Sequence, residues 1–316
     1  MSELSSPNVV ILSGGIGGAK LVDGFARIEQ RPALTVIGNI GDDIEQHGLW
    51  VSPDLDIVTY TLAKVVDTAK GWGYADETFH ALDALKQLGE DTWMNLGDRD
   101  LATHIYRTQQ RRAGVRPTEI AQAIARGLGV QHARVLPPTD ADLQTMVTTS
   151  EDTYDFQTWY LKLRCGPEPV DVTYAGSDVA TITPEVNAAV RQADLVVIAP
   201  SNPIASVAPI LAVQGMRTAL HETRANRIAV SPLVGGRSLK GPSDRMMRAM
   251  DYTADALGVA DYYKGLIDTL VIDDCDAAHG DEIRGRGIEP VATRTIMQQP
   301  EDRITLARAI IALQRA

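Results

Sequence analysis

The sequence predicts an α/β protein: a Rossmann-like, doubly wound and mainly parallel sheet with a mainly helical insertion. Three observations support this fold class. They are short apolar runs of strand length, helical patterns between several of them, and a loop rich in glycine, proline or aspartate after each run. Alternating strands and helices form parallel sheets that are buried on both faces. Because ligands of such sheets bind at the carboxyl ends of the strands, we expect these loops to converge on one crevice.

The core is expected from five apolar runs and the helical patterns that separate some of them. The runs are residues 9–12, 34–37, 195–199, 227–230 and 269–272, and two of the helical patterns are residues 205–213 and 242–257. Residues 302–315 have the pattern of a closing amphipathic helix. We accordingly assign residues 1–56 and 169–316 to a nucleotide-binding core.

The segment 57–168 interrupts this alternation. Helical patterns cover residues 57–66, 76–88, 101–113 and 118–128. Residues 170–183 then have the composition of a short β segment that returns to the core. The segment 57–168 is therefore predicted to be a mainly helical insertion.

Composition excludes several classes of function. The 316-residue chain has a formal net charge of −11, which argues against a nucleic-acid surface of clustered lysine and arginine. Its two cysteines, Cys165 and Cys275, form no C-x-x-C pair, which is typical of a reducing compartment. Residues 1–8 are polar rather than signal-like, and no apolar stretch approaches the ~20 residues that cross a bilayer. We expect a cytoplasmic protein that binds neither nucleic acid nor membrane.

The first apolar run leads through a glycine-rich loop into a helical pattern. Such a turn presents backbone N–H groups and a positive helix end to phosphate. The candidate phosphate-binding residues are Gly14, Gly15, Gly17, Gly18 and Lys20. The spacing fits neither the dinucleotide fingerprint nor the P-loop, since Leu21 stands where a P-loop has its magnesium-binding hydroxyl. An ordinary tight turn is the alternative, and the phosphate site is favoured.

Aspartates follow the second apolar run and open the next helical pattern. Carboxylates arriving from two loops suit Mg²⁺, and Asp42, Asp43 and Asp56 are the candidate ligands. The alternative for Asp54 and Asp56 is a helix start, with Ser52 as N-cap and the carboxylates at the positive end. Because residues two apart on a helix point to nearly opposite sides, only one of Asp54 and Asp56 is expected to face a ligand.

Two further groups of polar residues are candidates for ligand contacts. Arg99 could pair bidentately with phosphate, and His104 could donate to a ring or a phosphate. The alternative is a helix N-cap at Asp98 with a solvated Arg99. Arg237 and residues 240–243, which follow the Gly235-Gly236 turn, could bind the second end of a nucleotide together with Asn202. The alternative for residues 241–243 is an ordinary turn and helix cap.

Six motifs in this order resemble the 2-phospho-L-lactate transferases of coenzyme F-420 biosynthesis. They are Ser-Gly-Gly-Ile-Gly-Gly-Ala-Lys (13–20), Asn-Ile-Gly-Asp-Asp (39–43), His-Gly-Leu-Trp-Val-Ser-Pro-Asp-Leu-Asp (47–56), Leu-Gly-Asp-Arg-Asp-Leu-Ala-Thr-His (96–104), Pro-Ser-Asn-Pro (200–203) and Lys-Gly-Pro (240–242). The resemblance implies a Rossmann-like core with a smaller helical part, a homodimer and a magnesium-dependent enzyme. It also implies the reaction: the terminal ribityl hydroxyl of the deazaflavin Fo attacks the phosphorus bearing the acid of a guanosine diphosphate derivative, and GMP leaves.

The resemblance also implies roles for the candidate residues. The loop from Gly14 to Lys20 would cradle the diphosphate, together with Asp54 nearby. Asp42, Asp43 and Asp56 would hold Mg²⁺, and one of these carboxylates would orient the attacking hydroxyl. Arg99 and His104 would lie towards Fo, so the insertion would contribute to the deazaflavin side and to dimerisation. Asn202, Gly235 and Gly236 would line the guanosine side.

Residues 137–142 depart from the family pattern and leave the donor open. Phospholactyl, phosphoenolpyruvyl and 3-phosphoglyceryl donors are the alternatives, and a glyceryl hydroxyl would need a partner such as Thr139 or Asp140. A rival function is a non-catalytic, nucleotide-sugar-binding metabolic regulator of related fold, but the motifs at 54–56, 98–100 and 200–203 resemble the transferases. A nicotinamide oxidoreductase is disfavoured because Asn39 stands where such enzymes have an acidic ribose-binding residue.

Overall fold

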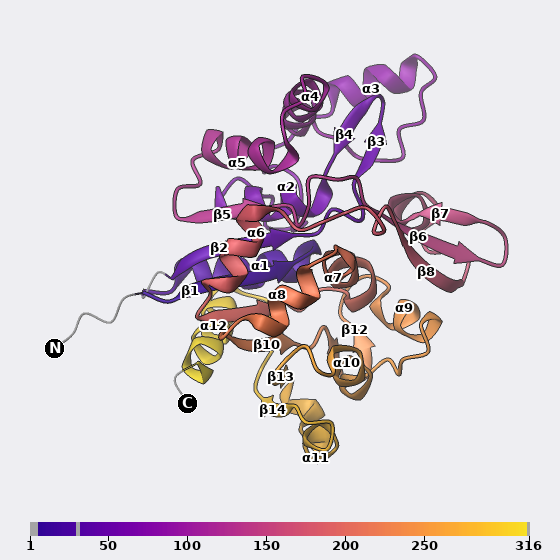
Figure 1. Ribbon diagram of the computed structural model, residues 1–316. Helices are drawn as coiled ribbons and strands as arrows, with labels where there is room; N and C mark the ends of the chain where they lie inside the picture. Colours follow the sequence, from indigo (N-terminus) through magenta and orange to yellow (C-terminus); the bar gives the residue numbers. More distant parts are fainter. Residues whose placement is uncertain (1–5, 30–31, 315–316) are drawn as a thin grey trace.

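The computed structural model describes residues 6–29 and 32–314 and has a seven-stranded parallel sheet at its centre (Figure 1). From one edge to the other the strands are β14 (Glu289–Ala292), β13 (Thr269–Ile272), β10 (Asn226–Val230), β9 (Leu195–Ile198), β1 (Asn8–Ser13), β2 (Ala33–Gly38) and β5 (Ala133–Leu136). Read from the β5 edge and counted along the chain, this order is 3-2-1-4-5-6-7, which begins as the Rossmann order does. The predicted fold class and its five expected strands are confirmed.

Helices cover both faces of the central sheet, and further helices lie beyond its β2 side. The helices are α1 (Gly15–Arg27), α2 (Pro53–Leu62), α3 (His80–Gln87), α4 (Asp98–Arg112), α5 (Pro117–Gly127), α6 (Pro184–Arg191), α7 (Ala208–Ala212), α8 (Met216–Glu222), α9 (Ser243–Ala249), α10 (Ala256–Tyr263), α11 (Gly280–Arg284) and α12 (Pro300–Leu313). Short π-helices η1 (Thr158–Lys162) and η2 (Pro203–Val207) and the 3-10 helix η3 (Asp274–His279) complete the set. Among the described residues, no helix combines the length and apolar character needed to cross a bilayer.

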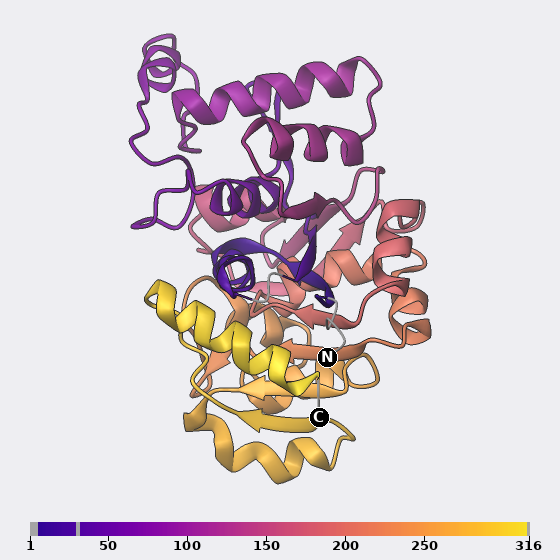
Figure 2. The same cartoon turned by 90° about the vertical axis from the view of Figure 1, so that its left-hand side faces the viewer.

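Strand β1 shows why the central runs are apolar throughout. Val9 and Ile11 lie in one core with residues of α1, α2 and α12, whereas Val10 and Leu12 lie in a second core with residues of α6, α8 and α10. Successive side chains of a strand point to opposite faces, so a strand with helices on both sides buries every residue. The two cores therefore account for the position of α12 beside α1 and for the layers in Figure 2.

The segment 57–168 supplies more than helices. Helices α3, α4 and α5 form a layer beyond β2 in both views, and the short hairpin of β3 (Ile44–Gln46) and β4 (Leu49–Val51) lies beside α4 (Figures 1 and 2). Strand β5 also belongs to this segment, yet it pairs with β2 in the central sheet. The division into a core and an insertion stays a prediction, and the segment contributes one core strand.

Two expectations about the later chain were wrong. Residues 170–183 were expected to return to the core, but β8 (Pro169–Ala175) joins β6 (Gln144–Thr149) and β7 (Thr153–Asp155) in a separate antiparallel sheet. The expected continuous helical pattern over residues 242–257 is divided between α9 and α10, with a turn at Asp251, whose φ is +61°. A residue with positive φ cannot continue a right-handed helix.

Candidate functional site

A cavity of about 680 Å³ opens at the carboxyl ends of the strands, where β1 and β9 lie side by side. This is the point at which the strand order reverses, and ligands of open α/β sheets bind there. Its wall includes the loops after β1, β2, β9 and β10 and residues of α2, α4 and η1. Four of the five loops that the sequence predicted to converge therefore line it, whereas Asp273 and Asp274 after β13 do not.

The glycine-rich loop forms one side of the cavity. Gly14, Gly15, Gly17 and Lys20 line the cavity, whereas Gly18 is buried behind it. A Cβ on Gly17 would lie 2.5 Å from the carbonyl oxygen of Pro200, so the loop after β9 leaves room only for glycine. Gly15 has a φ of +63°, which also favours glycine. The loop thus brings the positive end of α1 to the cavity.

Lys20 lies on the first turns of α1, where its ammonium donates to the carbonyl oxygen of Met297 at 2.8 Å. Burial lowers the pKa of Lys20, and the nearby charges of Arg303 and Lys240 lower it further. Lys20 and Lys240 both line the cavity, so cationic groups gather at the end of the cavity where the glycine loop lies. This end suits a ligand with several negative charges.

Asp42 and Asp54 form a pair of buried carboxylates in the cavity wall. The side-chain amide of Asn39 donates to Asp42 Oδ1 at 2.9 Å and to Asp54 Oδ2 at 3.0 Å. Burial raises the pKa of Asp42 well above its usual range, and the charges of Asp54 and Asp43 add to that effect. Burial also raises the pKa of Asp54 to about 6. Asp54 additionally accepts the backbone N–H of Gly15 at 2.6 Å.

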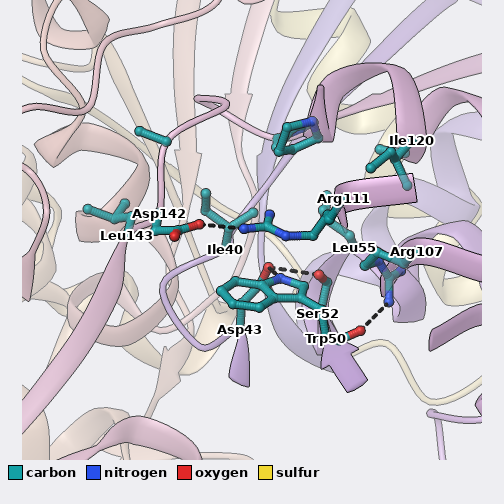
Figure 3. A pocket seen from close by; sticks show the side chains of 14 residues that line it. Ile40, Asp43, Trp50, Ser52, Leu55, Arg107, Arg111, Ile120, Asp142 and Leu143 are labelled. Carbon is teal, nitrogen blue, oxygen red and sulfur yellow. Dashed lines mark hydrogen bonds and ion pairs between the residues drawn. The ribbon is translucent and has the colours of Figure 1, made fainter. Parts of the chain in front are cut away.

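Asp43 faces a second, smaller cavity of about 30 Å³ (Figure 3). One of its oxygens accepts the Trp50 indole N–H at 3.0 Å and the Ser52 hydroxyl at 2.7 Å. The other oxygen has no hydrogen-bond partner among the described residues, and burial raises the pKa of Asp43 to about 7. Arg111 stacks on Trp50 with its guanidinium carbon 3.9 Å from the ring centroid. Asp43 thus borders the small cavity and does not line the large one.

Asp56 belongs to a buried network with residues of α4. Both Arg107 guanidinium nitrogens Nη1 and Nη2 donate to the Asp56 carboxylate. Arg107 Nη1 also lies 3.1 Å from His104 Nδ1. Because a guanidinium only donates, His104 Nδ1 must accept, and the ring proton is on Nε2, which lies 3.3 Å from Asp100 Oδ1.

The same network sets the protonation of its carboxylates. Burial raises the pKa of Asp56, and the charge of Arg107 opposes that effect. Burial also acts on Asp100, but contacts with His104 and a hydrogen bond from the Tyr60 hydroxyl at 2.7 Å leave its pKa lowered. Asp56, Asp100 and His104 bring ligand-type atoms within 4.8 Å of one another, yet Arg107 already occupies both oxygens of Asp56.

The chain matches the family described as 2-phospho-L-lactate transferase CofD over residues 9–304. It belongs to this family. The phosphoenolpyruvate transferase of Streptomyces avermitilis is 38% identical over 311 residues, with 96% of this chain and 97% of that protein covered. The 2-phospho-L-lactate transferase of Methanocaldococcus jannaschii is 34% identical over 307 residues, with 96% and 97% covered.

The resemblance seen in the sequence is therefore confirmed, and with it the assignment to a transferase family of coenzyme F-420 biosynthesis. Among solved structures, protein BH3568 of Bacillus halodurans aligns with a TM-score of 0.65 at 16% identity and covers 97% of this chain and 99% of its own. At that identity the likeness extends to the fold alone.

The CofD-family chain brings many of its expected site residues together. Asp42, Asp54, Asp56, His104 and Asn202 line the large cavity, as do Lys20 and three glycines of the loop, Gly14, Gly15 and Gly17. The expectation that only one of Asp54 and Asp56 faces it was wrong. Helix α2 begins at the cavity wall, so its first two turns both border the space, although the two carboxylates have different partners.

Other expected site residues lie outside the cavity lining. Arg99 is exposed, and its guanidinium donates to the carbonyl oxygen of Ala75. Gly235 and Gly236 have φ values of +57° and +72° and make the tight turn between β11 (Leu233–Val234) and β12 (Arg237–Ser238). Asn202 lines the cavity but also caps η2 by accepting the N–H groups of Ile204 and Ala205.

Residues 137–142 do not border the large cavity. Thr139 accepts the N–H of Ala141, and Asp140 binds Arg116 and the N–H of Thr118. Their polar groups thus stabilise the chain locally, and Pro137, Ala141 and Asp142 line only the small cavity. The departure from the family pattern in this loop therefore lies outside the large cavity.

Aromatic and apolar side chains form another part of the cavity wall. They come from α2, from the segment before α4 and from the β7–η1 region: Tyr60, Trp72, Trp93, Phe156, Tyr160 and Leu161. Phe156 and Tyr160 stack with ring centroids 5.3 Å apart and planes 16° apart. Such a wall suits a flat ring system.

The paired carboxylates fit a divalent cation. Asp42 and Asp54 are buried, share one amide donor and have raised pKa values, so a bound cation would favour their ionised forms. Oxygen ligands of this kind are those that Mg²⁺ prefers. Among the aspartates that sequence analysis singled out, Asp42 stays a candidate ligand, while Asp43 and Asp56 have other partners.

Proposed function

We propose that the protein transfers a phosphoester acid group from its guanosine diphosphate derivative to the terminal ribityl hydroxyl of the deazaflavin Fo and releases GMP. The group is phospholactyl, phosphoenolpyruvyl or 3-phosphoglyceryl, and the names of the relatives support the first two. The observation that supports this function best is the combination of groups that line one cavity. A glycine loop with lysines, a pair of aspartates and an aromatic wall line the cavity together.

In this proposal the donor lies between the start of α1 and the loops after β9 and β10. Backbone N–H groups at the start of α1, with Lys20 and Lys240, bind the diphosphate. Asn202 and the segment 231–243 border the guanosine. The flat ring system of Fo packs on the aromatic wall, so its ribityl chain extends toward the aspartates.

The aspartates organise the transfer. Asp42 and Asp54 would hold Mg²⁺, which neutralises charge on the diphosphate when it is bound. Asp56, fixed by Arg107, orients the attacking hydroxyl by accepting its hydrogen bond. The hydroxyl oxygen forms a bond to the phosphorus that bears the acid, the bond from that phosphorus to the GMP oxygen breaks, and the hydroxyl proton leaves to a carboxylate or to water. Positioning supplies most of the acceleration in such reactions, so a strong base is not required.

The test is a turnover assay with Fo, Mg²⁺ and donors generated from phospholactate, phosphoenolpyruvate or 3-phosphoglycerate, followed by mass. We expect one product mass to predominate and to disappear when the metal is chelated. Size-exclusion chromatography with light scattering tests the proposed homodimer. Failure of all donors to give product, with intact substrates and folded protein, would contradict the transferase. Product formation that survives chelation would contradict the magnesium requirement alone.

A further inference from the structure

Gln157 is a buried amide that neither the glycine loop nor the aspartate motifs include. It is 5% exposed and lies between β7 and the π-helix η1, where it borders the large cavity. Asp155 fixes the start of η1 by accepting hydrogen bonds from the N–H and the hydroxyl of Thr158. The next side chain, Trp159, is fully buried. The position of Gln157 is therefore well defined by its neighbours.

The Gln157 side chain reaches across 115 residues of sequence to Asp42. Its Nε2 donates to Asp42 Oδ2 at 3.1 Å, while Asn39 donates to Asp42 Oδ1 at 2.9 Å. Asp42 is thus held by one amide on each carboxylate oxygen. Both amides are neutral, so they fix the orientation of the carboxylate without cancelling its charge.

The antiparallel sheet of β6, β7 and β8, whose strand β7 ends two residues before Gln157, also binds the loop containing Asp42. The backbone N–H of Thr145 on β6 donates to the carbonyl oxygen of Gly41 at 2.6 Å. A Cβ on Gly41 would lie 2.5 Å from Thr145 Oγ1, so the loop and the sheet are in close contact. The antiparallel sheet therefore supports the Asp42 loop through its backbone as well as through Gln157.

We propose that Gln157 is a positioning residue that orients the Asp42 carboxylate for a divalent cation in the large cavity. This inference rests on the proposed magnesium site and assigns a role to an element outside the central sheet. Groups that hydrogen-bond to metal ligands fix the ligand orientation, and their loss typically weakens metal affinity or activity by about 10–100-fold. An unheld Asp42 could turn toward Asn39 alone and leave the cavity.

The experiment compares native full-length protein with Gln157→Met, which keeps the length of the side chain but removes the amide. Mn²⁺ is the probe, and its binding is measured by electron paramagnetic resonance without substrates. We expect the affinity of Q157M for Mn²⁺ to fall about 10–100-fold. In turnover, its Mg²⁺ requirement should rise while the KM values for donor and Fo at saturating Mg²⁺ stay close to native.

The matched control is Gln144→Ala, since Gln144 lies on β6 of the same sheet and does not border the cavity. We expect Q144A to bind Mn²⁺ as the native protein does. Native affinity in Q157M would overturn the inference and leave the transferase untouched. If the native protein binds no Mn²⁺ with or without GDP, both the proposed metal site and the positioning role of Gln157 are contradicted. The turnover assay then tests the transferase activity separately. A rise in the KM values for both donor and Fo, together with a lowered Tm of Q157M, would show a structural role instead.

Discussion

At the scale of single residues, Asp54 occupies the place that we assign to a donor phosphate. Its carboxylate accepts the N–H of Gly15 at 2.6 Å, at the positive start of α1. An Asp54→Asn variant keeps the shape of the side chain but replaces a charged acceptor with a neutral one. An incoming phosphate is then repelled less, and the side chain competes less strongly for the Gly15 N–H. We expect D54N to bind GDP up to about tenfold more tightly in metal-free buffer, and to lose the gain that Mg²⁺ gives the native protein.

Isothermal titration with GDP, with and without Mg²⁺, measures this change. Asp83→Asn is the control, because Asp83 is exposed on α3 and does not line the cavity. Weaker GDP binding by D54N in metal-free buffer would show that Asp54 supports the phosphate site rather than occupying it.

Gly17 gives a second residue-scale prediction. A Cβ there would meet the Pro200 carbonyl oxygen at 2.5 Å, so Gly17→Ala must displace the loop after β9. We expect a loss of about 1–3 kcal/mol in the free energy of unfolding and weaker donor binding. Gly127→Ala is the matched control, since a Cβ at Gly127 has no atom within 4 Å and α5 is helical there. Urea unfolding of both variants checks the contrast, and equal effects would refute it.

Sequence reasoning identified the aspartates and the glycine loop because short motifs mark them. It missed Arg107, although this residue falls on the same face of α4 as Asp100 and His104. Nothing in the spacing shows that this face meets Asp56, 51 residues earlier in the chain. Gln157 was missed for the same reason, since its partner is set by the packing of a separate sheet.

At the scale of elements, α4 places two of its arginines differently: Arg107 is buried in the site, whereas Arg99 is exposed. Arg107→Met would leave the Asp56 charge buried without its partner, so we expect a loss of about 3–5 kcal/mol in the free energy of unfolding, with turnover lost. Arg99→Met removes only an exposed contact and should change stability by no more than about 0.5 kcal/mol. Urea unfolding and turnover measure both. If R99M is stable but inactive, Arg99 acts on substrate as the sequence first implied.

The strands that sequence analysis found and missed differ in their place in the sheet. The five expected strands lie inside the sheet, where burial on both faces requires a continuous apolar run. The two missed strands, β5 and β14, are its edges. Arg134 of β5 is exposed and β14 contains Pro290, which are features of edge strands and give no continuous apolar run.

At the scale of the whole molecule, the alternation of strand and helix patterns predicted that the loops meet at one end of the sheet. Parallel strands have their carboxyl ends at the same edge, so the loops that follow them lie together. It did not predict that the antiparallel sheet of β6, β7 and β8 would approach that end. Such a contact depends on tertiary packing between segments that are distant in sequence. Tertiary packing also buries acidic side chains near this end of the sheet, and their burial affects the stability of the whole protein.

Asp43 makes that effect measurable. Burial raises its pKa from 3.8 to about 7, against hydrogen bonds from Ser52 and Trp50 and the charge of Arg107. The folded protein therefore holds this proton more tightly than the unfolded chain does. The contribution of Asp43 to stability is full below about pH 4 and is lost as pH rises to about 7, by about 1 kcal/mol for each pH unit. Asp43→Asn cannot ionise, so the free energy of unfolding of D43N should exceed the native value by an amount that grows across this window and is constant above it. Urea unfolding in chelator at several pH values measures the difference, and one that does not change with pH would mean that Asp43 is ionised in the folded protein throughout.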